Sequence, residues 1–449
     1  MGQRKILFTV HQFFPEFYAG TEVLTLNTAK EFQRRGYQVG ILTMIHTDEP
    51  KDYRCGGLKR ADYDGLPVWK IEYNFNRTLN PLTHEFNNPY MAEFMYAFLA
   101  EYKPDIVHIM HTFRFSASVI DAYLHYDIPV VMTATDFWFL CSRIQLMDSS
   151  NCDCSGPKYH GAKCIRCIAK QTNSDFSAKL DKIPLIFIEV GAFLAKWKNK
   201  KSDNIKAARF LFDRPKYLMK QLNKIDRVIV PTETMKQMLI NNGANKARIT
   251  KLHFGLNIVK ATEEPRIKKY SGKITFGYIG SILEHKGLHV LVKAFSLLDA
   301  KNASLLIYGD TGANPLYTKL IKEISNEDKR IKFMGTFPND QIMKIFKDID
   351  VLVVPSIWYE NTPLVIFSAF AAKTPVIGTD IGGITEVVKH GYNGMVFPKN
   401  NHKKLQNTLE KFLNENTLLE KLSGNIEPVK TISENVNEIE IIYDELLQR

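Results

Sequence analysis

Short apolar runs alternate with amphipathic segments along most of this 449-residue chain. Two of the apolar runs are Ile6–Val10 and Val39–Met44. Between them, apolar residues recur at helical spacing in Glu22–Arg35, and Gly36 ends this predicted helix. Alternation of strands and helices is typical of parallel sheets that are covered by helices. The pattern therefore predicts an α/β protein.

The alternation runs in two series, which the polar stretch Val259–Gly272 separates as a plausible linker. Further elements of the first series are expected at Asp105–Met110, Pro129–Thr133 and Asp226–Pro231 (strands) and at Thr232–Asn241 (helix). The second series predicts strands at Ile274–Ile279, Ser304–Tyr308, Ile331–Phe333, Val351–Val354 and Pro375–Gly378, and a helix at His289–Leu298.

Two domains are expected, because 449 residues exceed one hydrophobic core and domains cluster near ~100–200 residues. We predict a Rossmann-like domain over residues 1–258 and a second over residues 259–449. Ligands of such sheets bind at the carboxyl ends of the strands. Residues 141–170 are polar and rich in cysteine, and they predict an insertion in the first domain.

The net charge of +11 favours anionic partners, whereas 45% hydrophobic and 24% charged residues are typical of a globular protein. No Arg/Lys run with interleaved aromatic residues is present, so a nucleic-acid partner is not expected. The apolar core after Arg4 and Lys5 is too short for a signal peptide, which predicts a cytoplasmic protein with reduced cysteines.

One segment combines apolar and basic residues. The apolar run Ile183–Leu194 is shorter than the ~20 residues that span a bilayer. It is followed by Lys196, Lys198, Lys200, Lys201, Lys206 and Arg209. The pairing predicts peripheral association with a membrane, and a buried helix followed by a solvated loop is the alternative.

A candidate anion site follows the expected strand Val351–Val354. Glu360 lies in the next loop, and Asn361 or Thr362 is expected to cap the helix Leu364–Ala372. Pro363 suits the first turn of that helix. A helix start exposes free N–H groups, for which a nucleotide diphosphate is a natural ligand.

Two further loops belong to this pattern. Gly280 ends a strand, and Lys286 follows six residues later, just before Gly287. A flexible ammonium group can reach a pyrophosphate as a point charge. The loop Asp380–Gly383 follows the strand Pro375–Gly378 and contains paired glycines, which allow a backbone to approach a ligand closely.

In this order and spacing, the chain resembles the retaining GT-B glycosyltransferases that use no metal, a family that includes sucrose synthases and bacterial polysaccharide transferases. The resemblance is most specific over residues 274–398. It implies two Rossmann-like domains that face each other across a cleft. It also implies transfer of a sugar from a nucleotide-sugar donor to an acceptor hydroxyl with retention, in the synthesis of bacterial polysaccharides or glycolipids.

The resemblance also implies roles for single residues. Glu360 would contact the donor sugar, and Lys286 would neutralise the pyrophosphate. The donor would be held by the segment Asn361, Thr362, Pro363 and Leu364. Two positions depart from the family: Ser368 replaces a ribose-binding Glu and would bind a hydroxyl less strongly, and Ser281 replaces an Arg.

In the first half, Gly20 and Thr21 precede the helix expected near Glu22, and the resemblance implies that they reach the donor phosphates. A plain helix cap is the alternative. Asp136 follows the strand Pro129–Thr133, at the place where many family members have a His–Asp pair; the His position is Thr135. Asp136 is therefore expected in the catalytic centre, to orient the acceptor or bind the donor sugar, with helix capping as the alternative.

Two histidines and five cysteines complete the candidates. His108 and His111 lie near a strand end, where a packed core position is the commoner outcome and a site role for His111 is the alternative. The cysteines are Cys141, Cys152, Cys154, Cys164 and Cys167. The spacing of Cys152, Cys154, Cys164 and Cys167 allows a structural zinc site, with an iron–sulfur cluster or free thiols as alternatives.

Catalysis of the implied reaction needs no cofactor. Lys286 and helix N-termini would stabilise the leaving nucleotide diphosphate, while Glu360 positions the sugar and domain closure excludes water. The acceptor would be a glycan, a lipid-linked sugar or a small molecule. A sugar-nucleotide epimerase and a non-catalytic nucleotide-sugar or glycan-binding protein of the same fold are the alternatives.

Overall fold

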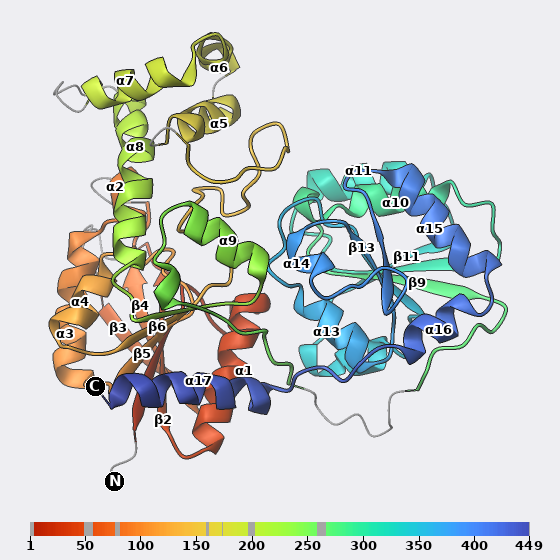
Figure 1. Cartoon of the computed structure of the whole chain (residues 1–449), viewed down its shortest axis with the longest axis horizontal. Coiled ribbons are helices and arrows are strands. Elements are labelled where there is room, and N and C mark those ends of the chain that lie inside the picture. The colour runs from red at the N-terminus through yellow and green to blue at the C-terminus, as the bar shows by residue number, and fades with distance from the viewer. Residues whose placement is uncertain are drawn as a thin grey trace. The chain divides into compact units, whose positions relative to one another are not determined.

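The computed structural model describes residues 4–48, 57–76, 81–158, 161–172, 174–195, 203–257 and 266–448. The chain divides into two compact units. Unit 1 comprises residues 1–253 and 433–449, and unit 2 comprises residues 254–432. Each unit is built on its own mainly parallel sheet with helices packed around it (Figure 1), so the α/β prediction is confirmed.

Unit 1 contains an eight-stranded sheet in the order β3-β4-β2-β1-β5-β6-β7-β8. Its strands are β1 (Lys5–Thr9), β2 (Gln38–His46), β3 (Gly57–Tyr63), β4 (Leu66–Tyr73), β5 (Ile106–Ile109), β6 (Val130–Thr133), β7 (Arg227–Val230) and β8 (Ile249–Lys251). The β3–β4 pair is antiparallel and the others are parallel. Strands β1, β2, β5, β6 and β7 were predicted, whereas β3, which is largely exposed, and also β4 and β8 were not.

The helices of unit 1 are α1 (Gly20–Arg34), α2 (Pro81–His84), α3 (Pro89–Tyr102), α4 (Val119–His125), α5 (Ala162–Thr172), α6 (Ser174–Asp181), α7 (Leu185–Ala195), α8 (Asp203–Leu222), α9 (Glu233–Asn241) and α17 (Ile432–Leu447). Helices α5, α6 and α7 gather at one end of the long α8, away from the sheet (Figure 1). This helical extension lies in the chain between β6 and β7.

Unit 2 contains a six-stranded parallel sheet in the order β11-β10-β9-β12-β13-β14. Its strands are β9 (Ile274–Ile279), β10 (Ala303–Tyr308), β11 (Ile331–Gly335), β12 (Val351–Val354), β13 (Val376–Thr379) and β14 (Gly394–Phe397). Its helices are α10 (Leu288–Ser296), α11 (Pro315–Ser325), α12 (Ile342–Ile345), α13 (Leu364–Ala371), α14 (Gly382–Thr385), α15 (His402–Asn414) and α16 (Leu418–Gly424). Five of these strands were predicted and β14 was not.

The C-terminal helix α17 belongs to unit 1, so the prediction of one domain over residues 259–449 is wrong at its end. Tyr443 stacks on Phe32, with ring centroids 5.0 Å apart. Glu440 accepts hydrogen bonds from Arg35 (2.8 Å) and Tyr37 (2.6 Å). An amphipathic helix needs an apolar surface to cover, but its sequence does not indicate which sheet supplies that surface. Of the predicted linker, residues 259–265 lie outside the described residues.

His108 is a core residue that connects α17 to the sheet. Its Nδ1 lies 2.6 Å from the Tyr443 hydroxyl, and its Nε2 lies 2.7 Å from the Thr133 hydroxyl. Burial lowers the pKa of His108 to about 3, so the ring is neutral.

The apolar run at 183–194 forms most of α7. Within the part of the chain that the structure describes, no helix is long and apolar enough to cross a membrane. The basic residues Lys196, Lys198, Lys200 and Lys201 lie outside the described residues, as do the side chains of Lys206 and Arg209.

Replacing Tyr443 with Phe should destabilise unit 1, because it leaves the buried His108 Nδ1 without its hydroxyl partner. We expect a loss of about 1–3 kcal/mol, seen as a lower melting temperature. Tyr392→Phe is the matched control, because the Tyr392 hydroxyl bonds to Glu427 at the surface. Equal effects of the two substitutions would contradict the role assigned to His108.

Candidate functional site

In unit 2, two loops that follow neighbouring strands are packed tightly against each other. Gly287 follows the loop after β9 and has a φ of +72°, and a Cβ atom on it would lie 1.9 Å from the Pro355 carbonyl oxygen, just after β12. The Ile357 N–H donates to the His285 carbonyl oxygen at 2.9 Å. Glycine is therefore needed at this position for both its conformation and its lack of a side chain.

This packing brings Lys286 to Glu360. The Lys286 Nζ donates to Glu360 Oε1 at 2.7 Å, and it also lies 4.9 Å from the centre of the Trp358 ring. The same carboxylate oxygen accepts from the Ser356 hydroxyl at 2.6 Å and from Trp358 Nε1 at 2.8 Å. Two residues predicted as site residues from separate motifs thus form one cluster.

The surroundings keep Glu360 ionised although its exposed fraction is only 6%. Burial by itself would raise the pKa of Glu360. The positive charge of Lys286 and the three hydrogen bonds outweigh burial, and the pKa is lowered. The site therefore holds a buried negative charge beside a cation whose side chain is 24% exposed.

Gly383, the second of the paired glycines, packs closely on the loop of Glu360, and contact of the pair with a ligand stays a prediction. A Cβ atom on Gly383 would lie 2.0 Å from the Glu360 carbonyl oxygen and 2.7 Å from that of Asn361. Gly383 therefore allows the loop after β13 to pack on the Glu360 loop. The close approach that glycine permits here is to the protein's own backbone.

The start of α13 also departs from the expectation. The N-cap is Pro363, and no side chain caps the helix, so capping by Asn361 or Thr362 is wrong. The Thr362 hydroxyl donates to the Asn361 carbonyl oxygen instead. Within the described residues, Asn361 Oδ1 is buried without a hydrogen-bond partner. An uncapped helix start next to an unpartnered polar atom is suited to a ligand with anionic and hydroxyl groups.

The two serines that replace charged family residues lie in different surroundings. Ser368 is 3% exposed, and its hydroxyl donates to the Leu364 carbonyl oxygen at 3.3 Å within α13. Ser281 is exposed after β9, and its carbonyl accepts from the Tyr278 hydroxyl at 2.7 Å. Binding of the donor by Ser368 stays a prediction.

Unit 1 has a second polar cluster, at the carboxyl ends of three adjacent strands. His11 follows β1, His111 follows β5 and Asp136 follows β6. His111 Nε2 lies 2.6 Å from Asp136 Oδ2, and the His11 and His111 ring centroids are 4.4 Å apart. This edge of a parallel sheet is the usual place for a ligand.

The hydrogen bonds of His111 assign its tautomer. The Phe113 N–H donates to His111 Nδ1 at 2.9 Å, so Nδ1 is an acceptor and Nε2–H donates to Asp136. Asp136 Oδ1 also accepts from the Trp138 N–H at 2.8 Å. His111, which follows the neighbouring strand β5, thus supplies the imidazole that pairs with Asp136, whereas the Thr135 hydroxyl donates to the Met110 carbonyl oxygen at 3.4 Å.

His11 and Glu22 also belong to this cluster and were not predicted. His11 Nε2 lies 3.8 Å from Glu22 Oε1, and Glu22 is fully buried. Burial lowers the pKa of His11 well below its usual value and raises that of Glu22. A polar residue directly after a buried strand was the available signal for His11.

Gly20 and Thr21 form the first turn of α1, which begins at Gly20 rather than near Glu22. Ala19 is the N-cap, and no side chain caps the helix. Gly20 is exposed and Thr21 is half-buried. Contact of these residues with the donor phosphates stays a prediction.

The five described cysteines are free thiols, and Cys152 is exposed. Burial raises the pKa of Cys164 to about 12, and the neighbouring thiols of Cys141, Cys154 and Cys167 add to the rise. Among the described residues, no group of three or more His, Cys, Asp or Glu side chains is arranged to hold a metal ion. The zinc site of Cys152, Cys154, Cys164 and Cys167 stays a prediction.

Two family models match the chain. The model of glycosyl transferases group 1 matches residues 259–427, and that of glycosyltransferase family 4 matches residues 18–149. The matches fall in units 2 and 1 respectively, and the first contains the whole Lys286–Glu360 cluster.

Individual proteins agree with these models. An uncharacterized glycosyltransferase of Methanocaldococcus jannaschii is 34% identical over 125 residues, which are 27% of this chain and 32% of the relative. The capsular polysaccharide biosynthesis glycosyltransferase CapM of Staphylococcus aureus is 27% identical over 239 residues, which are 49% of this chain and 60% of CapM. The matches thus span less than two thirds of these relatives' own lengths.

The fold agrees with that of solved glycosyltransferase structures. HepE of Anabaena, solved in complex with UDP and glucose, superposes with a TM-score of 0.64 at 14% sequence identity, over 98% of this chain and 100% of HepE. The two sheets and this likeness define a GT-B fold. With the family models on both units, we conclude that the chain belongs to the GT-B glycosyltransferases.

Replacing Gly383 with Ala should displace the loop that carries Glu360, because the added Cβ would overlap with the Glu360 carbonyl oxygen. We expect a lower melting temperature and weaker binding of a nucleoside diphosphate in a calorimetric titration. Gly424→Ala, at a helical position with open space around it, is the matched control. Unchanged binding by Gly383→Ala would contradict the packing described.

Replacing Lys286 with Met removes the charge that lowers the pKa of Glu360, so burial should then raise that pKa above 4.5. In the native protein the lowered pKa contributes stability above about pH 4.5, which is lost as the pH falls through the lowered value. In the variant, ionisation of the buried Glu360 destabilises the folded protein, so the contribution of Glu360 to the free energy of unfolding changes sign.

The difference in melting temperature between the native protein and Lys286→Met should therefore widen from about pH 4 to pH 7. Lys301→Met is the control, because Lys301 is exposed at the surface of the same unit. A difference that does not change with pH would contradict the coupling of Lys286 to Glu360.

Proposed function

We propose that the protein transfers a sugar from a nucleotide-sugar donor to an acceptor hydroxyl, with retention of the anomeric configuration and without a metal. The observation that carries this proposal is the ion pair of Lys286 with the buried Glu360, beside the uncapped start of α13. It places a cation, a carboxylate and free backbone N–H groups at the carboxyl ends of β9 and β12. A nucleotide-sugar presents a diphosphate and a hydroxyl-rich ring, which require these groups.

The cationic groups would bind the diphosphate part of the donor. The Lys286 ammonium has three donor hydrogens, so one can hold Glu360 while the others face the diphosphate. The first turn of α13 adds the positive end of a helix dipole. As the bond to the sugar breaks, negative charge grows on the departing diphosphate, and these fixed groups stabilise it.

Glu360 would hold the sugar. Its Oε1 takes the three hydrogen bonds from Lys286, Ser356 and Trp358, which fix the carboxylate in one orientation. Oε2 takes part in none of these three and can accept from a sugar hydroxyl. The buried amide oxygen of Asn361 is a second acceptor for a hydroxyl group.

The cluster of His11, His111 and Asp136 in unit 1 would bind or orient the acceptor. Asp136 is held by two hydrogen bonds, from His111 and from the Trp138 N–H, so its position is fixed before a ligand arrives. Gly20 and Thr21 at the start of α1 would contribute backbone N–H groups to the donor phosphates.

The biological role would be the synthesis of a bacterial polysaccharide or glycolipid at the inner face of a membrane. Support comes from CapM, whose name assigns it to capsular polysaccharide biosynthesis, and from HepE, whose complex contains UDP and glucose. The net charge of +11 is also suited to an anionic surface.

A second function, binding of a nucleotide-sugar or glycan without turnover, is favoured by one observation. The Ser368 hydroxyl is buried and donates within its own helix, at the position where the family has a ribose-binding carboxylate. An epimerase would need more acid and base groups beside the donor than Lys286 and Glu360.

The test compares Glu360→Gln with the native protein in thermal-shift experiments. A nucleoside diphosphate should stabilise both proteins, whereas the additional stabilisation by the sugar of UDP-glucose or GDP-mannose should be lost in Glu360→Gln. Glu323→Gln, at an exposed glutamate of α11, is the control. A Glu360→Gln protein that responds as the native one does would contradict the site.

Turnover separates the two functions. Release of nucleoside diphosphate from the donor by the native protein, and a product whose anomeric proton shows the donor's configuration, support the transferase. Nucleotide binding without turnover of any tested donor supports the binding protein.

A further inference from the structure

Helix α7 exposes a continuous apolar stripe. Its exposed fractions are 50% for Ile186, 65% for Phe187, 47% for Val190, 49% for Phe193 and 55% for Leu194. These positions recur at intervals of three and four residues, so they share one face of the helix. Exposed apolar stripes of this kind are uncommon on a protein surface unless a partner covers them.

The opposite face of α7 is already packed. Ile188 and Ala192 are 7% and 4% exposed, and they belong to a small core with residues of α5 and α8 such as Ile165 and Leu211. The helical extension therefore has a core of its own. The exposed stripe is separate from that core and is not needed to complete it.

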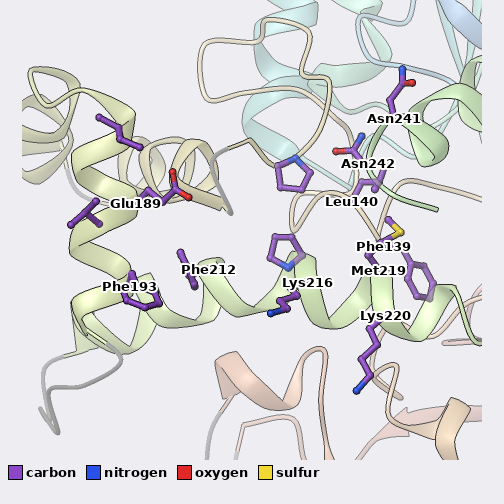
Figure 2. Close-up of a pocket in the computed structure, with 14 residues that line it drawn as sticks. Phe139, Leu140, Glu189, Phe193, Phe212, Lys216, Met219, Lys220, Asn241 and Asn242 are labelled. Atoms are coloured by element: carbon purple, nitrogen blue, oxygen red, sulfur yellow. The ribbon is translucent and has the colours of Figure 1, made fainter. Parts of the chain in front are cut away.

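A groove of about 1110 Å³ runs beside the stripe, entirely within unit 1 (Figure 2). Ile186, Val190 and Phe193 of α7 line it, so the groove and the stripe form one surface. Phe212 and Met219 of α8 line the groove along its length. Its size and apolar lining suit a hydrocarbon chain.

The same part of the chain is strongly basic. Residues 162–222 contain fourteen Lys and Arg and five Asp and Glu, a net charge of +9 out of +11 for the whole chain. Among the described residues, Lys216 and Lys220 are exposed on α8 at the groove, and Lys182 is exposed just before α7. Cations beside exposed apolar side chains complement an anionic lipid surface.

We propose that the stripe on α7 and the adjoining groove form a docking surface for an anionic lipid bilayer. The 11 residues of α7 are too few to cross a membrane, so the helix lies in the headgroup region. Its apolar side chains enter the interface, the lysines face the lipid phosphates, and the groove takes one hydrocarbon chain. The proposal names a site for membrane association and does not depend on the sugar-transfer reaction.

A protein partner explains the surface less well. The apolar centre of a protein–protein interface carries few charges, whereas Lys216, Lys220 and Glu189 line the groove and residues 162–222 have a large excess of positive charge. A lipid surface accepts apolar and cationic groups together, because its headgroups and chains lie in adjacent layers.

The first experiment measures sedimentation of the full chain with phosphatidylcholine vesicles that contain or lack phosphatidylglycerol. The native protein should bind only the anionic vesicles, and high salt should release it. The double variant Phe187→Glu, Phe193→Glu should lose binding at least about tenfold. Leu316→Glu, at a leucine that is 83% exposed on α11, should bind as the native protein does.

The second experiment tests the charges. Lys216→Glu with Lys220→Glu should weaken binding on the order of tenfold or more, since each cation near an anionic surface contributes to the affinity. Lys403→Glu with Lys404→Glu, at exposed residues of α15, changes the net charge equally and should have a small effect. Equal losses in the two pairs would overturn the assignment of the surface, because net charge alone would then explain binding.

The third experiment tests the groove with a phosphatidylglycerol that carries a photoreactive group at the end of its chain. Crosslinks to Phe212 or Met219 support the groove, and crosslinks confined to Phe187 and Leu194 overturn its part of the proposal. Nucleoside diphosphate binding should be unchanged in every variant, which separates a failure of this proposal from a failure of the proposed function.

Two results would overturn the proposal as a whole. One is a native protein that does not bind anionic vesicles. The other is a stable dimer in solution that Phe187→Glu, Phe193→Glu dissociates, which would make a second copy of the chain the partner of α7.

Discussion

The ion pair between Lys286 and Glu360 constrains much of unit 2. A carboxylate that is 6% exposed is costly unless a cation and hydrogen bonds compensate it. Three loops pack tightly around it: Gly287, after β9, contacts Pro355, after β12, and Gly383, after β13, contacts the Glu360 backbone. The carboxylate is thus oriented before a donor binds, which is the arrangement that electrostatic catalysis requires.

The sequence predicted those features that depend on local residue patterns. Apolar runs located the buried strands, including Ile274–Ile279 and Val351–Val354 without error, because strands covered on both faces contain few polar residues. The motif around Glu360 and Lys286 predicted residues that the structure brings together. Long-range packing was harder to predict: α17 follows unit 2 in the chain but packs in unit 1 through Tyr443, and no local pattern encodes that choice.

The errors in the candidate site also have physical causes. Thr362 suited a helix cap by its chemistry, but its hydroxyl bonds to the preceding carbonyl and Pro363 takes the N-cap position. The close packing of Gly383 on the Glu360 backbone was also not indicated by the sequence, because it joins loops from different strands. His11 was missed, because its partnership with His111 depends on the order of β1 and β5 in the sheet, which the sequence does not state.

The central claim is that Lys286, Glu360 and the start of α13 bind a nucleotide-sugar. The most direct measurement is a crystal structure of the protein soaked with UDP-glucose or GDP-mannose. The diphosphate should lie within hydrogen-bond distance of Lys286 Nζ and of N–H groups in the first turn of α13, with a sugar hydroxyl on the Glu360 carboxylate. A donor bound elsewhere, with the Lys286–Glu360 pair unchanged and no ligand atom near it, would show that these residues are not the donor site.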